Sequence, residues 1–116
     1  MHKLVILIHP SPYWQEKEDE WPEFLHLAEA MPALHREATS RVDRFLYGET
    51  AVVHMHELFF ETLEQAEQAM ASLQGRQAGA LLQKMSGGHM TLFIADHKED
   101  DIANLLKYRK ADAPEE

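Results

Sequence analysis

Histidine is the residue type in this chain best suited to chemistry, because its side chain transfers protons near neutral pH and binds transition metals. The chain holds eight histidines in 116 residues. His54 and His56 are separated by one residue within the apolar segment AVVHMHELFF, so in a strand both rings point to the same face. The pair is therefore our candidate for catalysis, as acid, base or substrate-orienting groups.

Two other interpretations of His54 and His56 stay open at this point. A metal site needs a third ligand, which His35 or His89 would have to supply from a neighbouring strand, since Glu57 points to the opposite face. In the other interpretation the two histidines are structural and hydrogen-bond within a half-buried sheet face. Our expectation is a chain that uses neither a metal ion nor another cofactor.

A ligand pocket is expected where the histidines at strand ends meet the aromatic residues of the first helical region. The aromatic residues could roof an apolar pocket between helix and sheet, although a stripe at helical spacing also suits a plain core. The candidate ligand-binding residues are His9, Trp14, Trp21, Phe24, His35 and His89.

The segments that must position these residues include three apolar strands, predicted over residues 3–9, 51–60 and 89–95. A more polar strand within residues 34–46 is predicted to pair with the second of them through the turn sequence YGET.

Apolar residues at spacings of three and four predict a first helix whose inner face runs from Trp21 to Met31. Pro22 suits its first turn, and the helix could start earlier, near Trp14. A short amphipathic helix is also predicted in the tail, over residues 98–110.

Two further helices are predicted between the third and fourth strands. Thr62 and Gln65 form a capping box for one of them, which Gly75 is expected to end. The other has its apolar stripe over residues 78–85 and ends at Gly87 and Gly88.

This order of elements predicts an α+β fold, a ferredoxin-like βαββαβ domain whose four-stranded antiparallel sheet has helices on one face. We expect a single domain over residues 1–116, with its core in residues 3–96. The strands are apolar on both sides, with Val5, Leu7 and Phe93 facing away from the helices. Because an uncovered apolar sheet face is unusual in soluble monomers, a homodimer paired through this face is predicted.

The composition argues against several partners. A formal net charge of −9 would repel the phosphate backbone of a nucleic acid, and no apolar run approaches the roughly 20 residues that span a bilayer. The chain has no cysteine, which fits a reducing interior and a cytoplasmic location.

The sequence resembles the EthD family of small dimeric α+β-barrel proteins over residues 3 to about 96. The resemblance is carried by the opening KLVILIHPSP, by LAEAMPAL, SRV and ELFFETLEQAEQAM, and by GGHMTLFIA near the end. It implies a homodimer whose two sheets form a barrel, with a small-molecule pocket between each sheet and its helices. Members often have a histidine in the first helix, but that position is Phe24 here, so the role is not transferred.

Family members are associated with the breakdown of small organic compounds. The resemblance therefore implies a homodimer that binds or helps to transform a small apolar organic molecule. The alternative is a non-catalytic dimeric module that binds a metabolite or supports a partner, with structural histidines.

Overall fold

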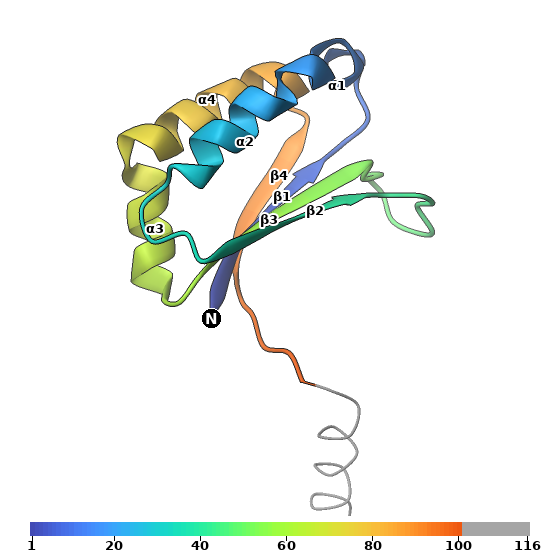
Figure 1. The fold of residues 1–116 in the computed structure, drawn as a ribbon. Helices are drawn as coiled ribbons and strands as arrows, with labels where there is room; N and C mark the ends of the chain where they lie inside the picture. The colour runs from blue at the N-terminus through green and yellow to red at the C-terminus, as the bar shows by residue number, and fades with distance from the viewer. Residues whose placement is uncertain (101–116) are drawn as a thin grey trace, which may run out of the picture.

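The computed structural model describes residues 1–100, and its centre is a four-stranded sheet (Figure 1). The strands are β1 (His2–Ile8), β2 (Arg36–Arg41), β3 (His54–Phe60) and β4 (Met90–Asp96). Their order across the sheet is β2-β3-β1-β4, and every neighbouring pair is antiparallel. The predicted four-stranded antiparallel sheet and the pairing of its second and third strands are confirmed. The predicted hairpin turn at YGET is not, because β3 begins at His54 and the two strands are joined by the longer connection of residues 42–53.

All helices cover the same face of this sheet (Figure 1). They are α1 (Pro12–Lys17), a 3-10 turn η1 (Glu18–Glu20), α2 (Trp21–Glu29), α3 (Leu63–Ala71) and α4 (Leu73–Ser86). The predicted first helix is thus two helices. Pro22 lies in the first turn of α2, where a backbone N–H would have no partner within the helix, so its missing N–H removes no hydrogen bond. Pro22 therefore favours a new helix that begins at Trp21.

The boundary between α3 and α4 corrects one prediction. Thr62 and Gln65 form the expected capping box, but α3 ends at Ala71 and not at Gly75. Ser72 serves both helices, because its N–H donates to the carbonyl of Ala69 and its hydroxyl accepts from the N–H of Gly75. A Cβ on Gly75 would overlap the carbonyl oxygen of Ala69, so this glycine permits the close approach of two helices.

The end of α4 is as predicted, since Gly87 is in the left-handed conformation with φ of 63°. The predicted tail helix lies mostly outside the described residues, and residues 98–100 have no regular structure. Within residues 1–100, none of the helices has the length and apolar character needed to cross a membrane. The extent of the domain beyond residue 100 stays a prediction.

The core lies between the sheet and the helices. Its largest fully buried apolar side chains come from β1, β3, α2 and α4, and they are Ile8, Phe24, Leu58, Phe60, Leu82 and Met85. The register places Ile8 opposite His54 and Ile6 opposite His56, so both histidines face the helices. The core therefore surrounds the two candidate catalytic residues.

None of the helices within residues 1–100 covers the other sheet face (Figure 1). Val5 and Phe59 are buried there by their neighbours, whereas Phe93 is 44% exposed. An ion pair between Lys3 and Glu57 also lies on this face, which the sequence pattern had suggested to be purely apolar. Arg36 lies on this face as well, with its guanidinium 3.8 Å from the centroid of the Phe59 ring and paired with Glu99. This face is therefore mixed, with exposed apolar side chains beside charges that are paired within the chain.

Candidate functional site

His56 is completely buried between the sheet and α2. Its Nδ1 lies 2.7 Å from the hydroxyl oxygen of Thr39, and its Nε2 lies 3.1 Å from a carboxyl oxygen of Glu37. Thr39 is paired directly opposite His56 in the β2–β3 register, and Glu37 lies two residues further along the same face of β2. Both ring nitrogens of His56 are therefore occupied by the protein itself.

Burial disfavours the charged forms of His56 and Glu37 in this cluster. Burial, together with the neighbouring His54, lowers the pKa of His56 to about 4. Burial and a hydrogen bond with Glu29 raise the pKa of Glu37 to about 7. One arrangement of protons gives Thr39, His56, Glu37 and Glu29 a complete set of hydrogen bonds. In it, Thr39 donates to Nδ1 of His56, Nε2–H of His56 donates to Glu37, and protonated Glu37 donates to Glu29.

His54 has different surroundings. Its ring lies between two indoles, with centroid distances of 5.3 Å to Trp14 and 4.7 Å to Trp21, the latter nearly perpendicular. Burial lowers the pKa of His54, so its imidazole is neutral at pH 7. Its Nε2 is buried and has no hydrogen-bond partner. Buried polar atoms are rarely left unpaired, so this nitrogen is an unused hydrogen-bonding group in the wall of the cleft between helices and sheet.

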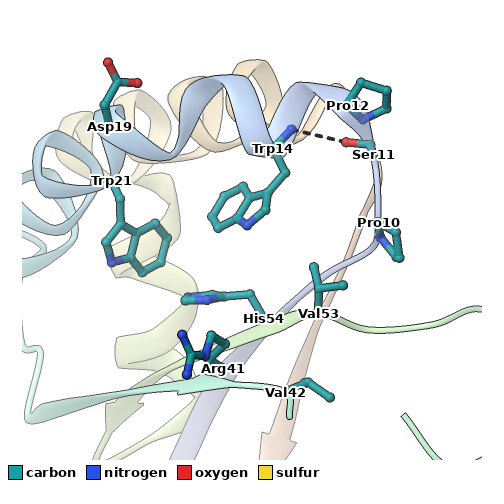
Figure 2. Close-up of a pocket in the computed structure, with 10 residues that line it drawn as sticks. All are labelled: Pro10, Ser11, Pro12, Trp14, Asp19, Trp21, Arg41, Val42, Val53 and His54. Carbon is teal, nitrogen blue, oxygen red and sulfur yellow. Dashed lines mark hydrogen bonds between the residues drawn. The ribbon is translucent and has the colours of Figure 1, made fainter. Parts of the chain in front are cut away.

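A pocket of about 1020 Å³ opens beside His54. In Figure 2 the indoles of Trp14 and Trp21 hang from the helical layer, the ring of His54 lies below them, and the guanidinium of Arg41 lies beside it. Pro10, Ser11, Pro12, Asp19, Val42 and Val53 complete the lining. The walls are largely apolar, with one imidazole and one cation reaching the interior.

The short helix α1 holds Trp14 in place. The hydroxyl of Ser11 accepts from the backbone N–H of Trp14 at 3.3 Å (Figure 2). The same hydroxyl donates to the carbonyl of Ser86, also at 3.3 Å. These bonds cap the helix and tie its start to the end of α4. Trp21 is fixed from below, since its ring stacks on Phe24 at 4.9 Å.

The structure brings three of the predicted site residues to this pocket, namely Trp14, Trp21 and His54. The ring of His56 lies directly beneath them, 5.1 Å from the ring of Trp21 and 5.7 Å from that of Phe24. The two candidate catalytic histidines therefore differ in access: His54 reaches the pocket and His56 does not.

The four other predicted ligand-binding residues, His9, Phe24, His35 and His89, are not among the residues that line the pocket. Both ring nitrogens of His9 are engaged, with the carbonyl of Ala51 at 2.8 Å and the hydroxyl of Thr91 at 2.7 Å. His35 is exposed, and His89 is exposed and stacks on Tyr13 at 6.4 Å.

The sequence interpretation missed the contribution of β2. The interleaved charges of this segment are typical of a solvated strand, yet Arg41 lines the pocket and Glu37 binds His56. Residues 37, 39 and 41 lie at every second position of one strand and therefore share one face of the sheet. This spacing is the sequence signal that groups them. Their alignment with the histidines depends on a register that the long β2–β3 connection leaves open.

Within residues 1–100, no cluster of three or more histidine, aspartate or glutamate side chains is arranged to hold a metal ion.

Comparison with known proteins finds no matching family model and no matching curated protein. Among solved structures, an EthD (ethyl tert-butyl ether D) family protein from Bacillus halodurans is similar, with a TM-score of 0.75 and 24% identity. The match covers 84% of this chain and 99% of that one. A protein described as dimeric, ferredoxin-like and of unknown function, from Jannaschia sp., matches with a TM-score of 0.62, 14% identity, and 83% and 97% coverage. The chain has a ferredoxin-like fold.

The ferredoxin-like neighbours include SnoaB from Streptomyces nogalater, described as a cofactor-independent oxygenase. It matches with a TM-score of 0.53 and 10% identity, over 85% of this chain and 93% of its own. At these identities the similarity concerns the fold, and function has to be argued from the site.

Proposed function

We propose that this chain is an EthD-like homodimer that binds a small, largely apolar organic molecule beside His54 and helps to transform it. The observation that carries the proposal is the position of His54, whose ring lies between two tryptophans in the lining of an apolar pocket while its Nε2 has no hydrogen-bond partner. An apolar pocket with a few polar groups is the usual form of a small-molecule site.

Proton abstraction from a carbon acid is the reaction that these groups suit best. His54 is neutral at pH 7 because burial lowers its pKa, so its ring can accept a proton. The C–H electron pair then moves into the carbonyl group of the substrate, which becomes an enolate. Arg41 lies beside His54 and forms no ion pair or hydrogen bond with another residue that the structure describes, so its cation is available to the enolate oxygen.

Two features of related folds support this proposal. SnoaB, with a similar fold, is described as cofactor-independent, so in that protein the fold works on its substrate without an added group. Several similar structures are described as dimeric, and the uncovered sheet face offers this chain a surface for a second copy.

Deuterium exchange into phenylacetone tests the proposal. This ketone has an acidified methylene group beside an aromatic ring, and loss of its methylene proton signal in D2O is followed by NMR. The wild type is expected to accelerate the exchange above the buffer rate. His54→Ala should return it to that rate, and Arg41→Gln should lower it at least about tenfold. The control is His26→Ala, at an exposed histidine on α2.

A non-catalytic metabolite-binding or accessory module is the second candidate. It is favoured by His56, whose ring nitrogens are both bound to side chains of β2, as a structural histidine requires. This function predicts phenylacetone binding without exchange. Exchange equal to the buffer rate in the wild type would contradict the catalytic proposal and leave the binding module.

A further inference from the structure

A second cavity, of about 260 Å³, lies between the sheet and helices α2, α3 and α4. It shares no lining residue with the His54 pocket. Its lining is apolar apart from one arginine and consists of Leu4, Ile6, Phe24, Met31, Leu58, Met70, Gly75, Arg76, Ala78, Gly79, Leu82 and Leu92. Phe24 forms part of the wall between the two sites, since it faces this cavity and also stacks on Trp21.

Gly79 keeps this cavity open. It lies in the interior of α4, where glycine is less favourable than alanine. No turn or close approach requires it, since its φ is not positive and an added Cβ would meet no heavy atom within 4 Å. The neighbouring Gly75 is different, because its Cβ would overlap the backbone of α3. The glycine at 79 therefore leaves free space that a side chain would occupy.

The mouth of the cavity combines apolar and cationic groups. Leu92 on β4 is 46% exposed and Met70 on α3 is 37% exposed, so apolar surface continues to the opening. Arg76 is the one charged residue among the lining residues that the structure describes, and its guanidinium forms no hydrogen bond or ion pair with another described residue. A guanidinium is the side chain best matched to a carboxylate.

We propose that this cavity is a second binding site, for an amphiphilic carboxylate whose alkyl tail fills the apolar interior and whose carboxylate pairs with Arg76. Apolar cavities of about 150 Å³ hold benzene, so about 260 Å³ suits an alkyl chain of roughly six to eight carbons. This site is separate from the proposed reaction at His54 and does not depend on it.

Octanoate and 1-octanol are suitable probes, because they share a tail and differ in charge. Binding to the full-length protein is measured by titration calorimetry. Octanoate should bind saturably. Gly79→Leu, which places a side chain in the cavity, should weaken both probes at least about tenfold, whereas Gly79→Ala, the matched control, should change affinity less than about threefold. Arg76→Gln should weaken octanoate about tenfold and leave octanol nearly unchanged.

Leu92→Trp blocks the mouth from the sheet side and replaces Gly79→Leu if that variant does not fold, as judged by circular dichroism. His54→Ala should leave octanoate affinity unchanged. If octanoate affinity is lost in His54→Ala, the probe binds in the His54 pocket and the proposal is overturned. Absence of saturable binding to the wild type, or full binding to a folded blocked variant, would also overturn it. None of these results bears on deuterium exchange at His54.

Discussion

His54 and His56 lie two residues apart on one face of β3, but only His56 has partners at both ring nitrogens. The difference comes from β2, which places Thr39 opposite His56 and Glu37 beside it. Arg41 is paired opposite His54 and lines the same pocket, but it forms no hydrogen bond to the ring of His54. The two histidines therefore have different surroundings: His56 links β3 to β2, and His54 lines the pocket.

We expect His56→Ala to destabilise the protein far more than His54→Ala. Loss of the His56 ring leaves a cavity in the core and removes the partners of Thr39 and Glu37, at a cost of about 2 to 4 kcal/mol in the free energy of unfolding. His54→Ala removes a ring without hydrogen bonds and should cost about 1 kcal/mol. Urea denaturation followed by circular dichroism measures both values.

The hydroxyl of Thr39 provides a matched control for this comparison. Thr39→Val keeps the shape of the side chain but leaves Nδ1 of His56 unpaired, so it should cost about 1 to 2 kcal/mol. Ser40→Ala, on the same strand but the opposite face, should change stability by less than about 0.5 kcal/mol. Equal losses for His54→Ala and His56→Ala would contradict the division of roles.

The pH dependence of stability should reveal the proton held by Glu37. Folding raises the pKa of Glu37 from 4.5 to about 7, so the folded chain binds a proton that the unfolded chain releases, and this contribution is lost as the pH rises toward 7. Folding lowers the pKa of His56 from 6.5 to about 4, so its contribution grows with pH between 4 and 6.5. The two trends oppose each other between about pH 4.5 and 6.5.

Glu37→Gln removes only the first of these trends. The stability of the variant should therefore rise more steeply than that of the wild type between pH 4.5 and 6.5, by at most about 1.4 kcal/mol per pH unit. Urea midpoints at four pH values from 4.5 to 7.5 measure the two profiles. Parallel profiles would show that Glu37 does not hold the proton.

The sequence predicted the fold well because hydrophobic periodicity and local turn chemistry dictate it. The run KLVILI and the capping box at Thr62 and Gln65 are local signals, and both predict the observed element. Gly75 was misassigned because its role is contact with the carbonyl of Ala69, a neighbour in space that helix-end chemistry does not reveal.

The candidate site was only partly predictable for the same reason. That His54 and His56 share a face follows from the period of a strand alone. Which of them is free depends on the register of β2, which is joined to β3 by a long loop and has no strong hydrophobic pattern to fix it. The pairing of Glu37 with His56 is thus a tertiary fact that composition and spacing do not contain.

Gly87 and Gly88 should respond differently to alanine. Both have positive φ, so each substitution strains the backbone by about 1 kcal/mol. At Gly87 the added Cβ would also overlap the ring of Tyr13, whereas at Gly88 it meets nothing. Gly87→Ala should therefore cost about 1 kcal/mol more than Gly88→Ala, measured by urea denaturation.

Because Tyr13 precedes Trp14 in α1, Gly87→Ala should also disturb the pocket. A change in tryptophan fluorescence in Gly87→Ala but not in Gly88→Ala would report this displacement. Identical spectra and equal stability losses would show that Tyr13 moves aside freely and does not anchor α1.

A charge on the uncovered sheet face should disrupt the proposed homodimer. Phe93 is 44% exposed on that face, and the pair of Lys3 and Glu57 is already neutralised within the chain. In a twofold dimer, Phe93→Asp would bring one unpaired carboxylate from each copy into the interface. The desolvation of these carboxylates and their mutual repulsion both oppose association. Analytical ultracentrifugation should give a dimer for the wild type and a monomer for the variant.

Leu73→Asp, at a leucine that is 58% exposed on the helical layer, serves as the control and should stay dimeric. A monomeric wild type, or a dimer that survives Phe93→Asp, would exclude pairing through this face.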